Sequence, residues 1–370
     1  MANSAIPIFE PHRRLFADYR MPAEWEPHQA TYLVWPHNLD TWPGKFEPIP
    51  MAFAQIAAAI GSREPVRILL RDRAESAAVR ELINESVVSM LGEGEHEHAI
   101  EYAEVPTNDS WVRDHGPIFV NRIERAPGLG PAQIALDWRF NSWGEKYGAF
   151  ILDDVVPLRL GELYDFEVIV PNIVLEGGSI DVNGAGSLLT TESCLLNPNR
   201  NPSLSRAEIE EYLKVYLGVK NVLWLGDGIE GDDTDGHVDD LARFVSPDTI
   251  VTVIEGDPAD DNYKVLQDNL DRLQSMRDQD GRPFRIETLP MPPPLYFDGS
   301  RLPASYANFY IANGAVVVPV FGCEADAEAI ATLGRLFPGR EVIGVPSGDL
   351  VWGLGAIHCL TQQHPLPYPG

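Results

Sequence analysis

A thiol follows a glycine-interrupted segment near the C-terminal end of the sequence. Cys359 comes shortly after Gly353 and Gly355 in the run 352–363. Glycine lets the backbone adopt unusual dihedral angles and approach a ligand closely, so this segment could present the thiol to a small molecule. Because a free cysteine is more often a small buried apolar residue, we interpret Cys359 as a nucleophile only together with the partners that the rest of the chain supplies.

A histidine with acidic neighbours supplies the first partner. His237 follows Gly236 within the acidic run 232–240, which favours a position near the surface of a cleft, where a carboxylate holds the imidazole protonated. A thiolate paired with such a histidine is an activated nucleophile. His358 is adjacent to Cys359, but adjacent side chains point to opposite faces of an extended segment. We therefore predict that His237 is the acid and base.

Three carboxylates in glycine-rich loops accompany the thiol and the histidine: Asp114, Glu176 and Asp239. If all three face one cavity that also holds a thiolate, the ligand is expected to be a cation, because unpaired buried charges of one sign are very costly. Carboxylates bind a guanidinium especially well through paired parallel hydrogen bonds. Trp111 lies three residues before Asp114 and could line the same cavity.

Two other classes of protein remain open from these residues. A Cys-His hydrolase of amides or peptides would need an oxyanion hole and no cluster of acids, so the three carboxylates count against it. A non-catalytic protein that binds polyamines or guanidines would keep the acids and would not need Cys359. Neither class would release ammonia from a guanidine.

The spacing of the polar motifs is nearly regular. Asp114 and Glu176 are 62 residues apart, Glu176 and His237 are 61 apart, and Asp239 and Cys359 are 120 apart. A period of about 60 residues predicts about five quasi-repeats that pack around a pseudo-symmetry axis, so that residues one period apart become neighbours. We expect a single catalytic domain over residues 1–370. Its units are predicted near 21–105, 106–170, 171–225, 226–290 and 291–370.

Hydrophobic periodicity predicts an alternation of strands and helices, which is typical of an α/β fold. Helices are expected near 51–60, 74–91, 151–164, 205–218, 263–276 and 325–336. Strands are expected near 31–35, 66–70, 100–105, 166–170, 222–225, 284–289 and 342–345. Pro157 limits the first turn of the helix at 151–164, and Ser205 with Glu208 predicts a capping box for the helix that follows.

The acidic composition limits the partners and the compartment. With 28 basic and 55 acidic residues, the formal net charge is −27, which disfavours nucleic acid and anionic membranes and attracts small cations. No stretch approaches the roughly 18 apolar residues of a membrane span, and residues 1–19 lack the apolar core of a signal peptide. Three cysteines without framework spacing favour a reducing compartment, and we expect a cytoplasmic location. His96 and His98 are predicted to lie in a solvated turn rather than a metal site.

Taken together, the motifs resemble those of the agmatine deiminases, in the guanidine-modifying superfamily that includes arginine deiminases, peptidylarginine deiminases and amidinotransferases. The matching segments are residues 21–28, 35–37, 108–117, 176–178, 234–239, 308–310 and 357–363. The resemblance covers nearly the whole chain. It implies a five-bladed, pseudo-symmetric α/β propeller of the pentein type, which agrees with the period read above, and no metal or organic cofactor.

The resemblance also implies a role for each site residue. Cys359 would be the nucleophile, His237 the acid and base, Asp114 and Asp239 the groups that grip the guanidinium, Glu176 the group that binds it and orients His237, and Trp111 a wall of the pocket. Attack of the thiolate on the guanidinium carbon would release ammonia and leave a covalent thiouronium adduct. Water activated by His237 would then release the ureido product, which is N-carbamoylputrescine for agmatine. The implied partner is a small cationic guanidine, and a homo-oligomer stays open.

The sequence departs from the family pattern at two places near the pocket. Agmatine deiminases usually carry Gly-Gly-Gly-Asn before Ile-His-Cys, whereas this chain has Leu354 and Ala356 in that stretch. His115 stands where a small or β-branched residue is more familiar. Free arginine, peptidyl arginine and other guanidines therefore stay open as substrates, although an acidic pocket would repel the α-carboxylate of arginine.

Overall fold

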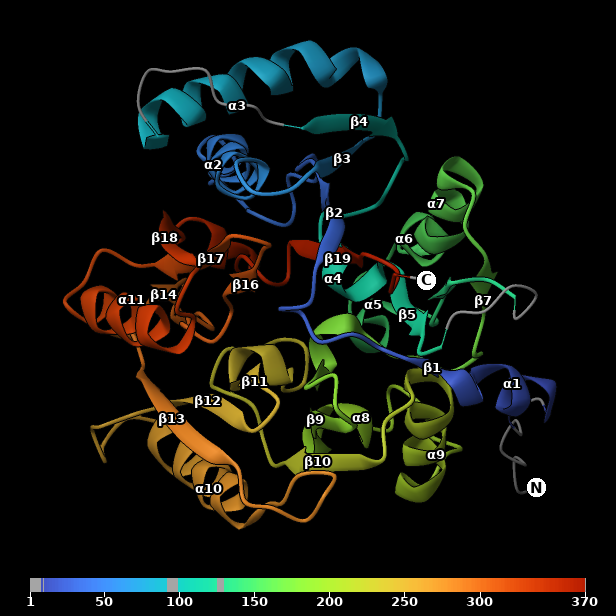
Figure 1. The fold of residues 1–370 in the computed structure, drawn as a ribbon. Helices are drawn as coiled ribbons and strands as arrows, with labels where there is room; N and C mark the ends of the chain where they lie inside the picture. Colours follow the sequence, from blue (N-terminus) through green and yellow to red (C-terminus); the bar gives the residue numbers. More distant parts are fainter. Residues whose placement is uncertain (1–7, 9, 92–98, 125–129, 370) are drawn as a thin grey trace.

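The computed structural model describes residue 8 and residues 10–91, 99–124 and 130–369. These residues form six small sheets of two to four strands, so the fold is mixed α/β, and no described sheet closes on itself. Figure 1 shows the segments following one another around the centre of the molecule, with α3 (Ser76–Leu91), α9 (Arg206–Leu217) and α10 (Asn262–Ser275) on the outside. His96 and His98 fall outside the described residues.

Five of the six described sheets share one pattern of pairing, in which an antiparallel pair adjoins a parallel pair. A parallel pair needs a crossover connection, usually a helix. Three of these sheets and their crossover helices are β8 (Asp181–Val182), β9 (Ser187–Thr191) and β10 (Asn221–Leu225) with α9; β11 (Ala242–Ser246), β12 (Thr249–Ile254) and β13 (Arg285–Pro290) with α10; and β16 (Tyr310–Ile311), β17 (Ala315–Val320) and β18 (Glu341–Pro346) with α11 (Ala325–Leu336).

The remaining sheets differ from these at their edges. One contains β5 (Ile118–Arg122), β6 (Gln133–Leu136) and β7 (Val168–Ile169), with β1 (Tyr19–Arg20) added beside β5. Another contains β2 (His28–Val34), β3 (Val66–Leu70) and β4 (Ile100–Glu104), with α2 (Ile49–Gly61) and α3 as crossovers. The sixth sheet is the hairpin of β14 (Tyr296–Phe297) and β15 (Ser300–Arg301).

The last strand, β19 (Thr361–Pro365), lies beside β2, which is near the start of the chain. It pairs antiparallel with β2, with Thr361 opposite Leu33 and Gln363 opposite Thr31. Cys359 lies two residues before this strand. The register between β19 and β2 therefore fixes where the thiol is placed, because a register shift of one residue would reverse the faces of all these side chains.

The predicted helices and strands are present, and one of them needs a correction. The segment 151–164 is not one helix but two, α6 (Ile151–Asp154) and α7 (Val156–Tyr164), which meet at Val155. Pro157 has no backbone N–H to continue the earlier helix, whereas it is tolerated in the first turn of a new one. The capping box is confirmed, since the side chains of Ser205 and Glu208 each accept a hydrogen bond from the backbone of the other.

One buried apolar cluster connects the helix α2 to the segment that carries the thiol. It contains Phe53 and Ile60 of α2, Ile68 of β3, and both Trp111 and Cys359. Packing in a protein interior is dense, so shifts are transmitted between neighbours. The position of the thiol is thus set by the core as well as by the β19 register.

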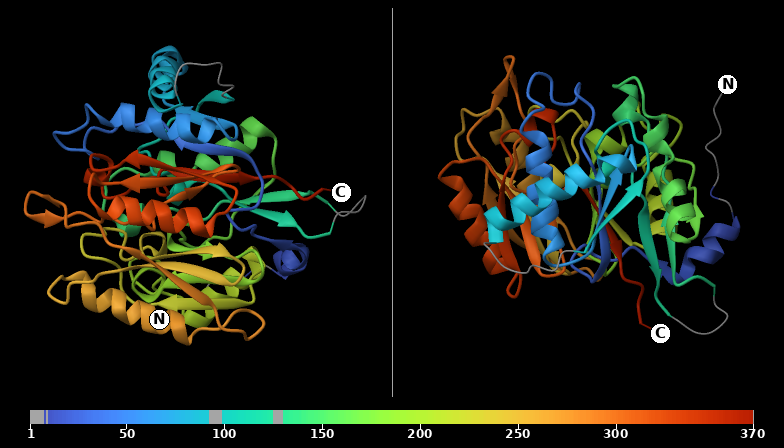
Figure 2. Two further views of the ribbon diagram at one scale, coloured as in Figure 1. Left: turned by 60° about the vertical axis from the view of Figure 1, so that its left-hand side comes forward. Right: turned by 90° about the horizontal axis from the view of Figure 1, so that it is seen from above.

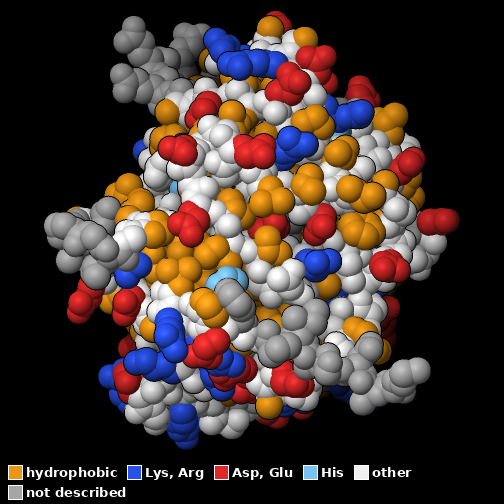
Figure 3. All heavy atoms as spheres, turned by 90° about the vertical axis from the view of Figure 1, so that its right-hand side faces the viewer, with side chains coloured by type: hydrophobic (Ala, Val, Ile, Leu, Met, Phe, Trp, Pro, Cys, Tyr) orange, Lys and Arg blue, Asp and Glu red, His pale blue; other side chains and the backbone are white. Residues whose placement is uncertain are grey.

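The surface is mixed in character. The turned views in Figure 2 show α10 and α11 on the outside of the molecule, and Figure 3 shows apolar side chains between charged ones on the right-hand face of Figure 1. On α7, Leu158 and Leu163 are exposed. Within the described residues, no helix combines the length and the apolar character needed to cross a bilayer.

We expect Leu213→Ala to lower the free energy of unfolding by about 2–5 kcal/mol, because truncation of a buried leucine leaves a cavity. Leu213 is fully buried on the inner face of α9, whereas the adjacent Lys214 is partly exposed. Urea unfolding of Leu213→Ala beside Lys214→Ala measures the difference. Equal midpoints for the two variants would contradict this account of the packing of α9.

Candidate active site

Loops from different sheets bring the predicted site residues together. Asp114 lies in α4 (Val112–His115), and Glu176 directly precedes η3 (Gly177–Ser179). Asp239 lies in η4 (Val238–Asp240), the short helix that begins directly after His237. The Nδ1 atom of His237 is 3.7 Å from Oδ1 of Asp114, and Sγ of Cys359 is 3.7 Å from Oδ2 of Asp239. The prediction that residues about one or two periods apart become neighbours is confirmed.

Gly178 lies at the centre of this group. Its backbone N–H donates a hydrogen bond of 2.9 Å to Oδ1 of Asp114. A Cβ atom at this position would lie 2.6 Å from Nδ1 of His237, 2.8 Å from Oδ1 of Asp114 and 3.0 Å from Oδ2 of Asp239. Three charged or polar side chains can converge here only because this residue has no side chain.

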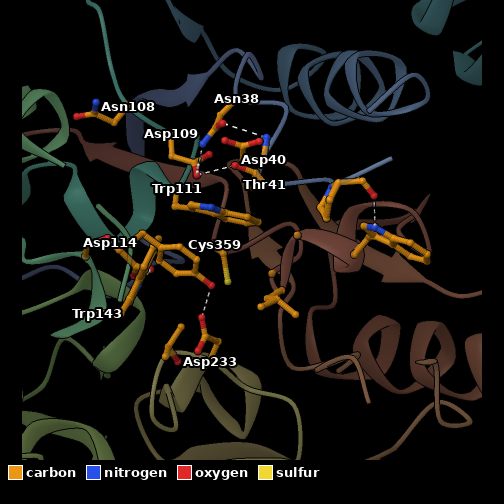
Figure 4. A pocket seen from close by; sticks show the side chains of 18 of the residues that line it. Asn38, Asp40, Thr41, Asn108, Asp109, Trp111, Asp114, Trp143, Asp233 and Cys359 are labelled. Carbon is orange, nitrogen blue, oxygen red and sulfur yellow. Dashed lines mark hydrogen bonds between the residues drawn. The ribbon is translucent and has the colours of Figure 1, made fainter. Parts of the chain in front are cut away.

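A cavity of about 930 Å³ opens beside the group. Cys359 and Asp114 reach it, and the indoles of Trp111 and Trp143 flank them, as Figure 4 shows. A Cβ on Gly355 would lie 2.5 Å from the ring of Trp111 and 3.2 Å from Cβ of Cys359, so the indole packs against the backbone beside the thiol. Trp111 thus lines the cavity, while its part in binding a substrate stays a prediction.

The cavity is strongly acidic. Six aspartates are among its described lining residues: Asp40, Asp109, Asp114, Asp153, Asp233 and Asp298. Arg71 is the only arginine or lysine among the described lining residues. A cavity with this charge attracts small cations.

The structure contradicts the predicted position of His237 at the surface of a cleft. His237 is fully buried, as are Glu176 and Asp239, and none of the three is among the described residues that line the cavity. The neighbouring acids turn inward: Oδ2 of Asp232 and the hydroxyl of Thr234 accept hydrogen bonds from the backbone N–H of His237 at 3.0 and 3.1 Å. Residues 236–240 of the acidic run are therefore buried, whereas 232–235 are partly exposed, and Cys359, Asp114 and Trp111 are the predicted site residues that line the cavity.

The segment around Cys359 is a turn, not the extended segment that was expected. The N–H of Thr361 donates to the carbonyl of His358 at 3.1 Å. Nδ1 of His358 is 2.6 Å from Oδ2 of Asp239, and its Nε2 is 2.8 Å from Oε2 of Glu24. The side chains of His358 and Cys359 thus approach the same oxygen of Asp239, and the geometric reason for setting His358 aside was wrong. His358 nevertheless lies outside the described lining of the cavity.

The protonation of the thiol and the imidazole follows from this burial. Burial raises the pKa of Cys359 well above its usual value, and the nearby carboxylates of Asp239, Asp240 and Asp114 raise it further. Burial by itself would lower the pKa of His237, but Asp114, Cys194 and Asp239 raise it well above the usual value. At neutral pH the group therefore holds a thiol and an imidazolium.

Asn308 contacts the thiol and was not among the predicted site residues. Its side-chain amide donates to Sγ of Cys359 at 3.0 Å and to Oδ1 of Asp240 at 2.9 Å, and its carbonyl oxygen accepts from the backbone N–H of His358 at 2.9 Å. The signal that could have found it is the period, because the segment 303–309 lies about one step before Cys359. A buried amide that bonds both the sulfur and the backbone holds the nucleophile in one orientation.

Trp143 and Cys194 were also missed. The indole N–H of Trp143 donates to Oδ2 of Asp114 at 2.9 Å, and Cys194 is buried within 4.8 Å of the ligand atoms of Glu176 and His237. Neither residue belongs to a recognised motif. Trp143 reaches Asp114 through a positive φ of 53°, which sequence periodicity does not reveal.

Among the described residues, one cluster has ligand atoms close enough for a metal ion: Glu176, Cys194 and His237. The guanidinium of Arg200 donates a hydrogen bond to Oε1 of Glu176. A buried positive charge beside the cluster disfavours a divalent cation. In this cluster Glu176 balances the charge of Arg200, which makes the cluster a poor metal site.

Comparisons with known proteins agree over nearly the whole chain. Residues 20–365 match the family described as Porphyromonas-type peptidyl-arginine deiminase. An agmatine deiminase of Pseudomonas aeruginosa is 40% identical over 373 residues, covering 94% of this chain and 96% of the relative. A structure of the agmatine deiminase of Enterococcus faecalis has a TM-score of 0.86 at 33% identity and covers 99% of this chain and 100% of that one. A substrate-bound variant of the C. jejuni agmatine deiminase has a TM-score of 0.83 at 31% identity, with 95% and 97% covered.

We expect Gly178→Ala to lower turnover by about 100-fold or more while the fold is kept, because small displacements of reacting groups are that costly. The added Cβ would push on His237, Asp114 and Asp239. Gly348→Ala is the control, since a Cβ there meets no atom within 4 Å. Near-wild-type rates for Gly178→Ala, measured by steady-state kinetics, would contradict the convergence described above.

Proposed function

The chain belongs to the Porphyromonas-type peptidyl-arginine deiminase family, and we propose that it catalyses the hydrolytic deimination of agmatine to N-carbamoylputrescine and ammonia. The resemblance to agmatine deiminases that the motifs predicted is confirmed by relatives at about 40% identity over nearly the whole chain. One observation carries the proposal: a thiol, Cys359, opens together with Asp114 onto an acidic cavity. That arrangement suits a cationic substrate with an electrophilic carbon.

We assign the binding of the guanidinium to Asp114 and Asp239. Asp114 reaches the cavity, and Asp239 lies 3.7 Å from the sulfur. Within the described residues, Oδ1 of Asp239 and Oε2 of Glu176 have no hydrogen-bond partner, although both are buried. Buried polar atoms are normally hydrogen-bonded, and the N–H groups of a bound guanidinium would satisfy these oxygens. Two carboxylates that fix the plane of the cation also present its carbon for attack.

The proposed reaction begins with attack of the Cys359 sulfur on the guanidinium carbon. The pKa of His237 is raised by Asp114, Cys194 and Asp239, so its imidazolium can supply a proton to the departing nitrogen. The C–N bond breaks, ammonia leaves, and a thiouronium adduct remains on the sulfur. Water then attacks that carbon, His237 takes the proton of the water, and the C–S bond breaks to release the ureido product.

The proposed roles of Asn308 and of the substrate explain how a thiol with a raised pKa reacts. The N–H of Asn308 stabilises a negative sulfur, because hydrogen bonds to an ion are stronger than those to a neutral group. A guanidinium held by Asp114 and Asp239 places a positive charge where it offsets the carboxylates that raise the pKa of Cys359. The thiol of Cys359, which lines the cavity, therefore loses its proton to solvent when the substrate is bound, and the resulting thiolate is the species that attacks. No metal or organic cofactor takes part in this scheme.

We further propose that the described sheets are the blades of a five-bladed α/β propeller in one catalytic domain. Five sheets with the same pairing pattern support this arrangement, and the site residues lie in the connections between them. The quasi-repeats predicted from the period are part of this proposal. Pairing of β19 with β2 places the C-terminal strand in the same sheet as the first predicted unit, which would close the ring.

The proposal also concerns which other guanidines the cavity would accept. The acids of the cavity disfavour free arginine, because its α-carboxylate would be repelled. Leu354 lines the cavity at a positive φ of 68°, so the departure from the family pattern lies where the substrate would bind.

A cytoplasmic location, no binding of nucleic acid and a homo-oligomer remain predictions. Exposed Leu158 and Leu163 on α7 offer apolar surface for a second copy.

Ammonia release from agmatine, free arginine, an arginyl peptide and methylguanidine tests the function. We expect turnover of agmatine by the wild-type enzyme and none by Cys359→Ser, because serine is a much weaker nucleophile in this setting. Turnover of only another guanidine would keep the chemistry and refute the substrate. Ammonia release that persists in Cys359→Ser would refute the proposed nucleophile.

The raised pKa of Cys359 predicts how alkylation of the free enzyme depends on pH. Only the thiolate reacts with iodoacetamide, and below the pKa its fraction grows about tenfold per pH unit. The rate constant should therefore keep rising between about pH 7 and pH 9, where an unperturbed thiol would begin to level off. Mass spectrometry of the labelled Cys359 peptide gives the rate constant. A plateau near neutral pH would instead indicate a preformed thiolate.

A further inference from the structure

A carboxylate from the entry loop, residues 21–28 between β1 and the start of β2, lies beneath the site and outside the described lining of the cavity. Glu24 is buried, and its Oε1 accepts a hydrogen bond of 2.8 Å from the backbone N–H of Ile311. Its Oε2 faces three nitrogen atoms: Nε2 of His358 at 2.8 Å, a guanidinium nitrogen of Arg243 at 2.9 Å and one of Arg113 at 3.5 Å. This oxygen is thus the point where one imidazole and two buried guanidinium groups meet.

His358 connects Glu24 to Asp239. Its two ring nitrogens face carboxylate oxygens, at 2.6 Å from Asp239 and 2.8 Å from Glu24. His358 therefore bridges the two carboxylates and links the orientation of Asp239 to that of Glu24.

Two buried guanidinium groups share the Glu24 carboxylate. Arg243 also donates to Oδ2 of Asp181 at 3.1 Å, and Arg113 lies 3.5 Å from Glu24. Burial by itself would raise the pKa of Glu24, but Arg243, His358 and Arg113 lower it well below its usual value. Removal of one carboxylate would leave a buried positive charge without a counter-ion, which is costly.

We propose that Glu24 is a positioning residue for the deimination. Through His358 it fixes the orientation of the Asp239 carboxylate, and it cancels positive charge beneath the site that would otherwise repel a guanidinium. Asp239 is the connecting group, since the same oxygen that His358 contacts lies 3.7 Å from the sulfur of Cys359. This inference rests on the proposed function, because it needs a cationic substrate at Asp239.

Glu64 provides a matched control. It is buried like Glu24 and holds the same entry loop, with Oε1 at 3.0 Å from Nδ1 of His28 and Oε2 accepting from the N–H of Asn313 at 2.7 Å. Among the described residues, the side chain of Glu64 makes its hydrogen bonds with His28, Thr31 and Asn313 and none with His358 or Arg243. Glu24→Gln and Glu64→Gln both remove one buried charge and keep the shape of the side chain, so they differ in their connection to Asp239.

Binding of agmatine to the full-length Cys359→Ser protein, measured by calorimetry, tests the proposal without turnover. We expect Glu24→Gln in this background to weaken the affinity about tenfold or more, which is about 1.4 kcal/mol, and Glu64→Gln to leave it within about twofold. In the enzyme that keeps Cys359, Glu24→Gln should raise KM by a similar factor. Equal losses in the two variants would show a merely structural role and overturn the proposal, as would unchanged affinity in Glu24→Gln.

A coupling measurement tests the path through Asp239. If Glu24 acts through His358, then adding Glu24→Gln to Asp239→Asn should weaken agmatine binding little beyond Asp239→Asn alone, because residues in one network are not additive. Additive losses would overturn the path. His358→Asn should weaken binding as Glu24→Gln does, and it carries the test if Glu24→Gln does not fold; unchanged affinity in His358→Asn would overturn the proposal.

These outcomes are separate from a failure of the proposed function. If the wild-type enzyme releases no ammonia from agmatine and the Cys359→Ser protein does not bind it, the function falls and this inference falls with it. If the wild-type enzyme turns agmatine over and Glu24→Gln binds it as the parent does, only the role of Glu24 is refuted.

Discussion

The structure depends on holding several carboxylates together at one buried place. Asp114, Glu176 and Asp239 are all buried and meet around Gly178 and His237, and their mutual repulsion acts in a medium that screens it poorly. The protein offsets this with buried cations rather than with solvent. Arg200 bonds Glu176, and an imidazolium faces Asp114 at 3.7 Å. A cationic substrate would complete this charge compensation, because one oxygen each of Asp239 and Glu176 has no hydrogen-bond partner in the described part of the chain.

The fold provides this arrangement through its connections rather than through its sheets. Each described sheet is small, five of the six have antiparallel and parallel pairs side by side, and the residues of the site lie in short connections between strands. A turn has few hydrogen bonds of its own with which to resist displacement. The indole of Trp111, the amide of Asn308 and the register of β19 supply the missing rigidity by packing, by hydrogen bonds and by strand pairing.

The acidic residues of the sequence serve two different purposes, which the structure separates. Those that line the cavity, such as Asp233, create a field that attracts a cation. Those behind it, such as Asp232, accept hydrogen bonds from the backbone and shape the turn that carries His237. Because both kinds occur in the same run of sequence, the run reads as one exposed acidic segment when only composition is considered. That is why His237 was expected at the surface of a cleft and is found fully buried.

The sequence by itself determined the chemistry that is available here. A thiol, a histidine and three carboxylates recur at a spacing of about 60 residues in glycine-rich loops, and this pattern predicted which side chains meet. Only the tertiary structure decided which of them face the cavity, how the turn before β19 aims both His358 and Cys359 at one oxygen, and that Glu24 and Asn308 belong to the same group. The physical reason is that residue type and period report which groups converge, whereas burial, charge balance and the direction of a side chain depend on contacts between distant segments. Glu24 and His358 are 334 residues apart, and no local pattern joins them.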